Sequence, residues 1–198
     1  MSGVSETYYR INNGPVKAIS IDGQPLITTE WMNNTIEYWS VDNAGNEELS
    51  HKILTGIKLD KTAPSIMHVS RVPENNVEPD QEVKVSVNVT DFLSGVQNVV
   101  LSYTLNYGKS WNNLIMTYNS TNGLYETTIK VQQANVQVEY KIIAYDNAGN
   151  CRVEDNSGQY YTYTVIPEFP SPIILTISIL TTTILLILAR YRRLKHRK

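Results

Sequence analysis

The chain has 198 residues, one cysteine and a formal net charge of −2. Removing the six cations of residues 190–198 leaves −8 for residues 1–189, and an acidic body without a basic patch excludes nucleic acid as an expected partner. The single cysteine, Cys151, excludes an intrachain disulfide and a metal site built from cysteines, so the core alone must hold the fold.

The body is expected to be all β, with one module used twice. Thirteen tyrosines and many Val, Ile and Thr residues favour strands, and no window before the tail keeps a helical period. Ser2-Gly3-Val4 recurs at residues 94–96, and Asp42-Asn43-Ala44-Gly45-Asn46 recurs without a change at residues 146–150. Such a repeat predicts tandem domains of the same fold.

The first copy, residues 1–59, is expected to be a partial module. It opens at Ser2-Gly3-Val4, whereas the second copy reaches the same motif only after its first two strands. The first copy therefore lacks the equivalents of those two strands. We expect the missing strands, and a secretion signal, to lie upstream of Met1. The strands predicted for this copy are residues 7–11, 16–21, 35–41 and 51–59.

The second copy, residues 60–166, is expected to be a complete sandwich of two antiparallel sheets. Val83, Val85, Val87 and Val89 alternate with polar residues, which is typical of a strand with one buried face. In the strand at 136–145, the predicted inward set includes Tyr140 and Ile142. Seven strands are predicted, at residues 66–72, 82–90, 96–105, 111–118, 124–130, 136–145 and 159–165.

Three motifs of the second copy carry a family resemblance. They are the connector Asp60 to Pro64, the Asp-x-x-Ser-Gly-Val at 91–96 and the Tyr-x-Ile-x-Ala-x-Asp-Asn-Ala-Gly-Asn at 140–150. Together they resemble the Ig-like and fibronectin-like repeats of bacterial and archaeal surface proteins. The resemblance covers nearly all of residues 2–166 and implies a fold and a location, but no ligand.

The C-terminus is expected to be a membrane anchor. No charged side chain occurs from Phe169 to Ala189, and 21 helical residues span about 30 Å, the thickness of a bilayer core. We therefore predict a linker at 167–172, a transmembrane helix at 173–189 and a basic tail at 190–198. Basic residues beside a span stay in the cytoplasm, so the body should lie on the cell surface.

The same segment also resembles a processing signal. Pro167, Glu168 and Phe169, followed by an apolar run and a basic cluster, resemble the PEF-type C-terminal sorting signals of archaeal surface proteins. The resemblance implies cleavage near the motif by an archaeosortase-like membrane enzyme. The alternative is an uncut single-span anchor, and both place the chain on the outer surface.

The repeated Asp-Asn-Ala-Gly-Asn is the best candidate for a metal site. Asp42 and Asn46 in the first copy, and Asp146 and Asn150 in the second, offer the closely spaced oxygen ligands that Ca²⁺ prefers. Calcium takes six to eight oxygens, and nothing nearby in the sequence completes the set. We favour a hairpin turn in which the aspartate accepts hydrogen bonds from nearby amides.

Two further kinds of surface site are predicted. Asn33, Asn88 and Asn119 open glycosylation acceptor sequences, and Asn88 falls on the polar face of its strand. Aligning the two repeats places Trp39 on the outward face of its strand, as a candidate contact for a surface polysaccharide or a neighbouring surface protein. Packing between modules is the alternative role for the tryptophans.

No catalytic motif is found, so we expect neither an enzyme nor a cofactor. The sequence favours a surface-anchored repeat protein that acts as a structural spacer, envelope component or adhesion module. The alternative is a polysaccharide-binding accessory part of a secreted hydrolase whose catalytic domain lies upstream.

Overall fold

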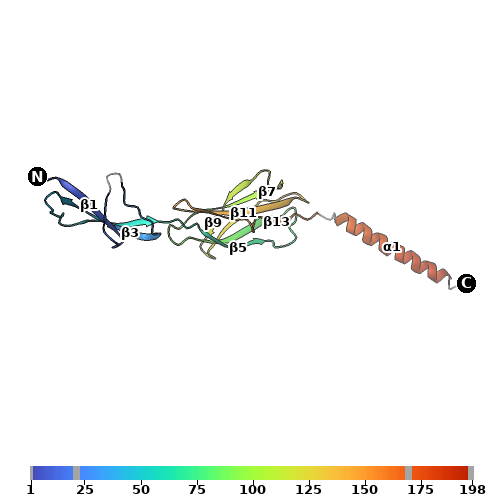
Figure 1. The fold of residues 1–198 in the computed structure, drawn as a ribbon. Helices are drawn as coiled ribbons and strands as arrows, with labels where there is room; N and C mark the ends of the chain where they lie inside the picture. Colours follow the sequence, from blue (N-terminus) through green and yellow to red (C-terminus); the bar gives the residue numbers. More distant parts are fainter. Residues whose placement is uncertain (1, 20–22, 168–170, 196–198) are drawn as a thin grey trace.

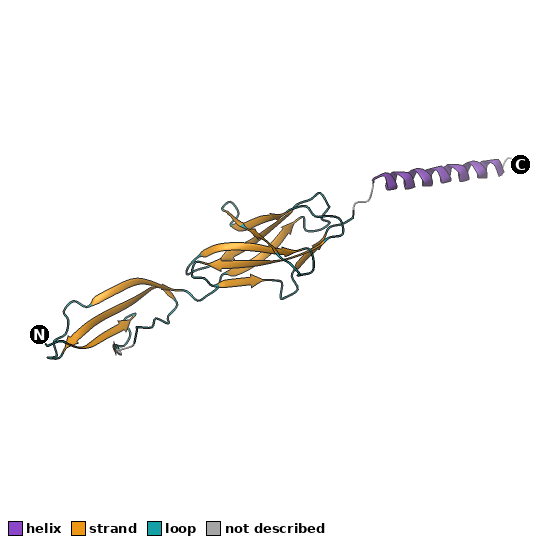
Figure 2. Ribbon diagram, turned by 90° about the horizontal axis from the view of Figure 1, so that it is seen from above, coloured by secondary structure: helices purple, strands orange, loops and turns teal. Residues whose placement is uncertain are grey.

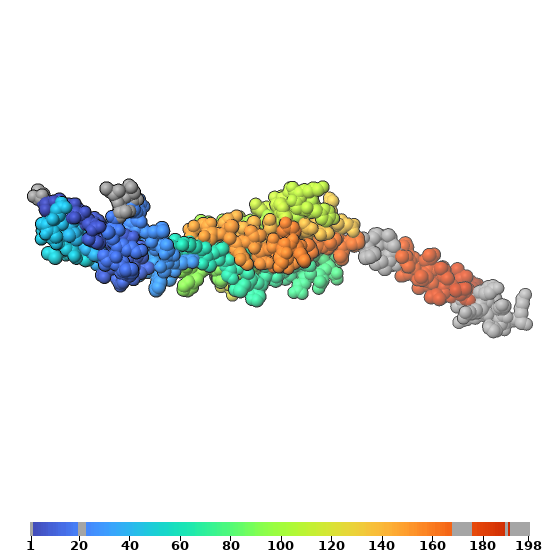
Figure 3. Space-filling view, viewed as in Figure 1, coloured from blue at the N-terminus to red at the C-terminus, as the bar shows by residue number. Residues whose placement is uncertain are grey.

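The computed structural model describes residues 2–19, 23–167 and 171–195. A first β unit, a second β unit and a C-terminal helix follow one another along the molecule, with the N-terminus and the helix at opposite ends (Figures 1 and 3). Every regular element described before the helix is a strand (Figure 2). The all-β expectation for the body is confirmed.

The first unit is one antiparallel sheet. Its strands are β1 (Val4–Ile11), β2 (Lys17–Ala18), β3 (Trp31–Asp42) and β4 (Lys52–Leu59), in the order β2-β1-β3-β4. The predicted strand at 16–21 is limited to two described residues, and residues 20–22 lie outside the described part. Within the described residues up to 59, no second sheet covers this one.

The second unit is a sandwich of two antiparallel sheets. One sheet has the order β5-β6-β10-β9, and the other has the order β12-β11-β7-β8, with β13 paired to β11. The strands are β5 (Ser65–Val72), β6 (Val83–Thr90), β7 (Val96–Thr104), β8 (Asn112–Ile115), β9 (Thr117–Asn119), β10 (Leu124–Ile129), β11 (Gln137–Asp146), β12 (Cys151–Glu154) and β13 (Tyr161–Thr164).

The core of the second unit lies between its sheets, as the alternation predicts. The four valines of β6 are buried, and β11 buries Val138, Tyr140, Ile142 and Ala144 against them. Leu101 of β7 is also fully buried. Each fully buried aliphatic side chain of this kind contributes about 1.5–3 kcal/mol through removal of apolar surface from water.

The first unit repeats one sheet of the sandwich. The order β2-β1-β3-β4 matches β8-β7-β11-β12, because the repeated motifs place β1 on β7 and β3 on β11. The face of β3 that corresponds to the buried face of β11 has no opposing sheet among the described residues. Tyr38, which aligns with the buried Ile142, is 36% exposed as a result.

Two predicted strands of the second unit differ from the structure. Residues 111–118 are predicted as one strand, but β8 and β9 belong to different sheets. Met116 lies between them, is 3% exposed and donates its N–H to Val99 O. The chain therefore passes from one sheet of the sandwich to the other at this residue. The predicted strand at 159–165 is the shorter β13, and β12 has no predicted counterpart.

The C-terminal helix α1 (Ser171–Lys195) begins with Pro172 in its first turn, where a missing N–H costs nothing. Its described apolar side chains between 177 and 188 are exposed. Thr181, Thr182 and Thr183 donate their hydroxyls to carbonyls three or four residues earlier. Within the described part of the chain, no helix combines the length and the apolarity needed to cross a membrane. The span predicted at 173–189 is therefore not confirmed.

Candidate functional site

Both copies of Asp-Asn-Ala-Gly-Asn form the same turn. Asp42 Oδ1 accepts the N–H groups of Ala44 and Asn46 at 2.9 and 2.8 Å, and its Oδ2 accepts the Asn46 amide at 2.9 Å. In the second copy, Asp146 accepts the equivalent three donors at 2.9, 2.8 and 2.8 Å. These bonds are the ones that the turn interpretation predicts. The hydrogen bonds from Asn46 lower the pKa of Asp42 far below its ordinary value.

The structure adds two aspartates to the turn of the second copy. Asp60 of the connector and Asp91 after β6 join Asp146, with one carboxylate oxygen from each lying within 4.8 Å of the others. Asp146 is fully buried, and the other two are half-buried. We call these three side chains the aspartate triad. Asp42, Asn46 and Asn150, the other calcium candidates, do not belong to this group of acids.

Backbone amides of Ser94 and Gly95 donate hydrogen bonds to two members of the aspartate triad. Ser94 donates its N–H to both Asp60 and Asp91, at 2.9 and 3.0 Å, and Gly95 donates to Asp91 at 2.6 Å. Hydrogen bonding from Ser94 lowers the pKa of Asp60. Three carboxylate oxygens suit a hard cation but fall short of the six to eight that Ca²⁺ takes. Because its members come from three segments, the triad brings together the connector, the β6–β7 loop and the β11–β12 turn.

The triad lies beside the junction of the two units. From the first unit, Glu30 Oε1 accepts the Lys61 N–H at 2.7 Å and the Thr62 hydroxyl at 2.6 Å. From the second, Asn150 donates its amide to the Asp60 carbonyl at 3.4 Å. The connector is thus bonded to both units. A cavity of about 310 Å³ opens here, lined by Trp31, Met32, Lys58, Leu59, Asp60, Leu93, Ser94, Asn147 and Ala148.

Trp39, predicted as an exposed contact residue, is buried. It is only 7% exposed, because His51 stacks on its ring with a centroid distance of 4.2 Å and an interplanar angle of 6°. Tyr8, paired with Trp39 across β1 and β3, stacks at 6.1 Å. The repeat places Trp39 on the face of β3 that is opposite to Tyr38, and the strand register agrees. The predicted exposure of Trp39 is wrong because Tyr8 and His51 of the first unit cover that face.

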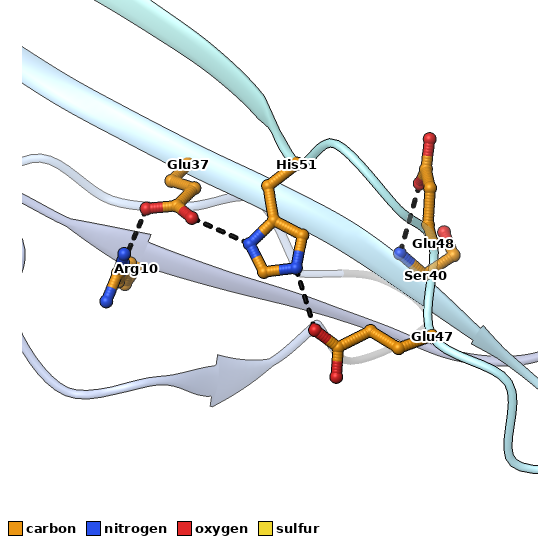
Figure 4. Close-up of polar contacts among 6 residues, drawn as sticks. All are labelled: Arg10, Glu37, Ser40, Glu47, Glu48 and His51. Carbon is orange, nitrogen blue, oxygen red and sulfur yellow. Dashed lines mark hydrogen bonds and ion pairs between the residues drawn. The ribbon is translucent and has the colours of Figure 1, made fainter.

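A polar network surrounds the His51 ring (Figure 4). His51 Nδ1 lies 2.7 Å from Glu37 Oε1, and its Nε2 lies 2.8 Å from Glu47 Oε1. Arg10 pairs with the second oxygen of Glu37 at 2.5 Å. Hydrogen bonding to Glu37, the largest cause, and to Glu47 raises the pKa of His51. Hydrogen bonds from Arg10 and His51 lower the pKa of Glu37.

The three glycosylation candidates differ in the freedom of their side chains. Asn119 is held at both ends, because its amide donates to Glu126 and its oxygen accepts the Thr121 N–H. Asn33 is exposed and accepts the Gly56 N–H through its oxygen. Asn88 lies half-buried on β6, between the buried Val87 and Val89.

Two other sequence features have distinct outcomes. Pro167 is exposed, whereas Glu168 and Phe169 of the sorting motif lie outside the described residues. Cys151 is an exposed free thiol at the start of β12. A thiol in this position is available to reagents in solution.

The sequence contains all three aspartates of the triad, but the motifs around them predict a fold and no shared site. Asp60 and Asp91 both belong to the motifs that carry the resemblance to surface repeats. Their meeting with Asp146 depends on sheet order, which places two loops and the connector at one end of the sandwich. The His51 network has no sequence signal, because its partners lie on separate strands and loops.

One protein-family model matches the larger part of this chain. A family model described as "Domain of unknown function (DUF7743)" matches residues 58–184, which is more than half of the chain. The chain belongs to the DUF7743 family. The DUF7743 region takes in the connector, the whole second unit and the first half of α1, and it begins after most of the first unit.

Comparisons with individual proteins add little to the DUF7743 assignment. No curated protein sequence matches the chain. Among solved structures, similarity is found to "Structures of Clostridium thermocellum CbhA fibronectin(III)-like modules", with 11% identity, a TM-score of 0.38, and coverage of 83% of this chain and 80% of that one. The sandwich assignment rests on the two sheets of the second unit and not on this similarity.

Proposed function

We propose that this protein is a non-enzymatic spacer of the cell surface, which holds its N-terminal end away from the membrane. The observation that carries the proposal is the bonded junction. Glu30 ties the connector to the first unit, and Ser94 and Asn150 tie Asp60 to the second. A connector held from both sides keeps two β units end to end, as a spacer requires (Figure 1).

The C-terminal helix supplies the proposed anchor. Residues 169–189 carry no charge, and the hydroxyls of Thr181 to Thr183 are satisfied within the helix, as a lipid environment demands. The family match runs from the sandwich into this helix, so the two occur together. Because the described residues include no helix fit to cross a membrane, the experiment must separate a surface location from an internal one.

Cys151 provides the test of location. A membrane-impermeant maleimide applied to intact cells should label it, because the thiol is exposed on the second unit and is the only one in the chain. The variant Cys151→Ser should remove the signal. Labelling that occurs only after the cells are lysed would place the body inside the cell and overturn the proposal.

The sorting signal is a finer part of the proposal. If an archaeosortase-like enzyme processes the chain, protein isolated from its native membrane should end near Pro167 to Ser171. Intact mass and the C-terminal peptide measure this directly. A chain that still ends at Lys198 would leave an uncut anchor and would reduce the Pro-Glu-Phe match to coincidence.

The polysaccharide-binding alternative loses its first contact residue, since Trp39 is 7% exposed. Trp31 is the exposed tryptophan that lines the cavity at the junction, together with Met32. No observation in the described residues favours a sugar over other occupants there, so the spacer role is the function that we propose.

A further inference from the structure

The small core of the first unit is built around a histidine. Trp39 is the only large apolar side chain that is buried among the described residues of this unit. The His51 ring stacks on its indole. His51 lies at the end of the β3–β4 loop, residues 43–51, which also carries the first Asp-Asn-Ala-Gly-Asn turn. The ring therefore links the end of this loop to Trp39 of β3.

The geometry around the ring favours a protonated histidine. Both nitrogens lie within 2.8 Å of carboxylate oxygens, Nδ1 at Glu37 and Nε2 at Glu47 (Figure 4). A neutral imidazole has one N–H and one lone pair, and an ionised carboxylate only accepts hydrogen bonds. Both contacts are hydrogen bonds only when each nitrogen carries a proton. A neutral ring would turn a lone pair toward one of the two glutamates.

The other charged groups around the site are consistent with this state. Arg10 of β1 contacts the far oxygen of Glu37, so that glutamate lies between two cations. Glu48 directs its carboxylate to the Ser40 N–H, away from the ring (Figure 4). Tyr8, which also stacks on the indole, donates its hydroxyl to Glu6. The ring is thus faced by two acids and no other cation makes contact with it in the described residues.

We infer that His51 is a pH-sensitive clasp, whose protonated ring holds the Glu47 side chain of the β3–β4 loop and releases that side chain when the ring becomes neutral. Release is local. The backbone bonds from Glu48 N to Ser40 O and from Asp42 N to Asn46 O remain when the ring loses its proton. The parts that become free are the Glu47 side chain and the stacked ring over Trp39.

The direction of the pH dependence follows from the two shifted groups. The raised pKa of His51 means that its contribution is complete below about 6.5, the ordinary value, and is lost as pH rises through the folded-state pKa. The lowered pKa of Glu37 means that its contribution is present above about 4.3 and is lost as pH falls. The clasp is therefore complete in mildly acidic solution and opens toward alkaline pH.

Titration of the full 198-residue chain by NMR, with nitrogen-15 in the histidine rings, tests the inference. His51 is assigned by comparison with His51→Gln. We expect both of its ring nitrogens to be protonated at pH 6 and its midpoint to lie above about 6.5. The variant Glu47→Gln should lower that midpoint, because the Nε2 proton loses an anionic acceptor.

Two controls separate the clasp from a general effect. His68→Asn, at an exposed position on β5, should leave the His51 titration unchanged. In the wild type, the melting temperature of the first unit should fall toward alkaline pH as the clasp opens. His51→Phe keeps an aromatic ring over Trp39 without the N–H groups, so this variant should not show that fall. A midpoint at or below the ordinary value, or one protonated nitrogen at pH 6, would overturn the inference even if a variant fails to fold.

Discussion

Glu126 gathers four donors on the outer face of the sheet β5-β6-β10-β9. Its oxygens accept Lys84 Nζ at 2.8 Å, the amides of Asn119 and Asn122 at 3.0 and 2.9 Å, and the Ser86 hydroxyl at 3.3 Å. The hydrogen bond from Lys84 is the largest cause that lowers the pKa of Glu126 to about 2. A carboxylate with this many partners is a structural centre and has no free oxygen for a ligand.

A pH-dependent contribution to stability follows at this residue. The pKa is lowered on folding, so the contribution is present above about 4.3 and is lost as pH falls toward about 2. The variant Glu126→Gln should melt below the wild type at pH 7, and the difference should shrink at pH 2. Circular dichroism melts at both pH values measure it. Glu82→Gln, which breaks the more exposed pair with Lys130, should change the melting temperature less; equal effects would contradict the prediction.

At the scale of the strand, the two units place similar strands in different surroundings. Ile142 of β11 is fully buried between two sheets, whereas Tyr38 at the same position of β3 is 36% exposed. We expect Ile142→Ala to lower the free energy of unfolding by about 2–5 kcal/mol, because it leaves a cavity in a closed core. Tyr38→Ala should cost less, since little encloses its ring. Denaturant unfolding of both variants measures the two costs, and an equal cost would show that the face of β3 is also covered.

The strands that the sequence predicts well are those with one buried face. Val83 to Val89 alternate with polar residues, and the period of two alone identifies the inward side. The switch at Met116 escapes prediction because both halves of residues 111–118 have strand composition, and a change of sheet leaves no periodic signal. Register places Trp39 on the correct face of β3, but it does not say which face of a lone sheet becomes covered.

At the scale of the molecule, the triad shows the same limit. Each aspartate is visible in the sequence as a turn or connector residue, yet their meeting within 4.8 Å depends on how the sheets stack. Sequence patterns report local geometry, whereas this contact joins residues 60, 91 and 146. The arrangement of the two units likewise depends on a few bonds at the connector, so it can be tested there.

Glu30→Ala removes two of the bonds that tie the connector to the first unit, at Lys61 N and Thr62 Oγ1, and leaves the weaker bond from Lys61 Nζ to Thr28 O at 3.4 Å. Both bonds end on a charged acceptor at the surface, so their loss should loosen the junction while each unit stays folded. Spin labels at Cys151 and at an introduced Ser5→Cys would report this motion as a broader distance distribution. Glu82→Ala, within the second unit, should leave the distribution as narrow as in the wild type. A broad distribution in the unaltered chain would mean that the junction is not held, and the spacer would then be a flexible tether.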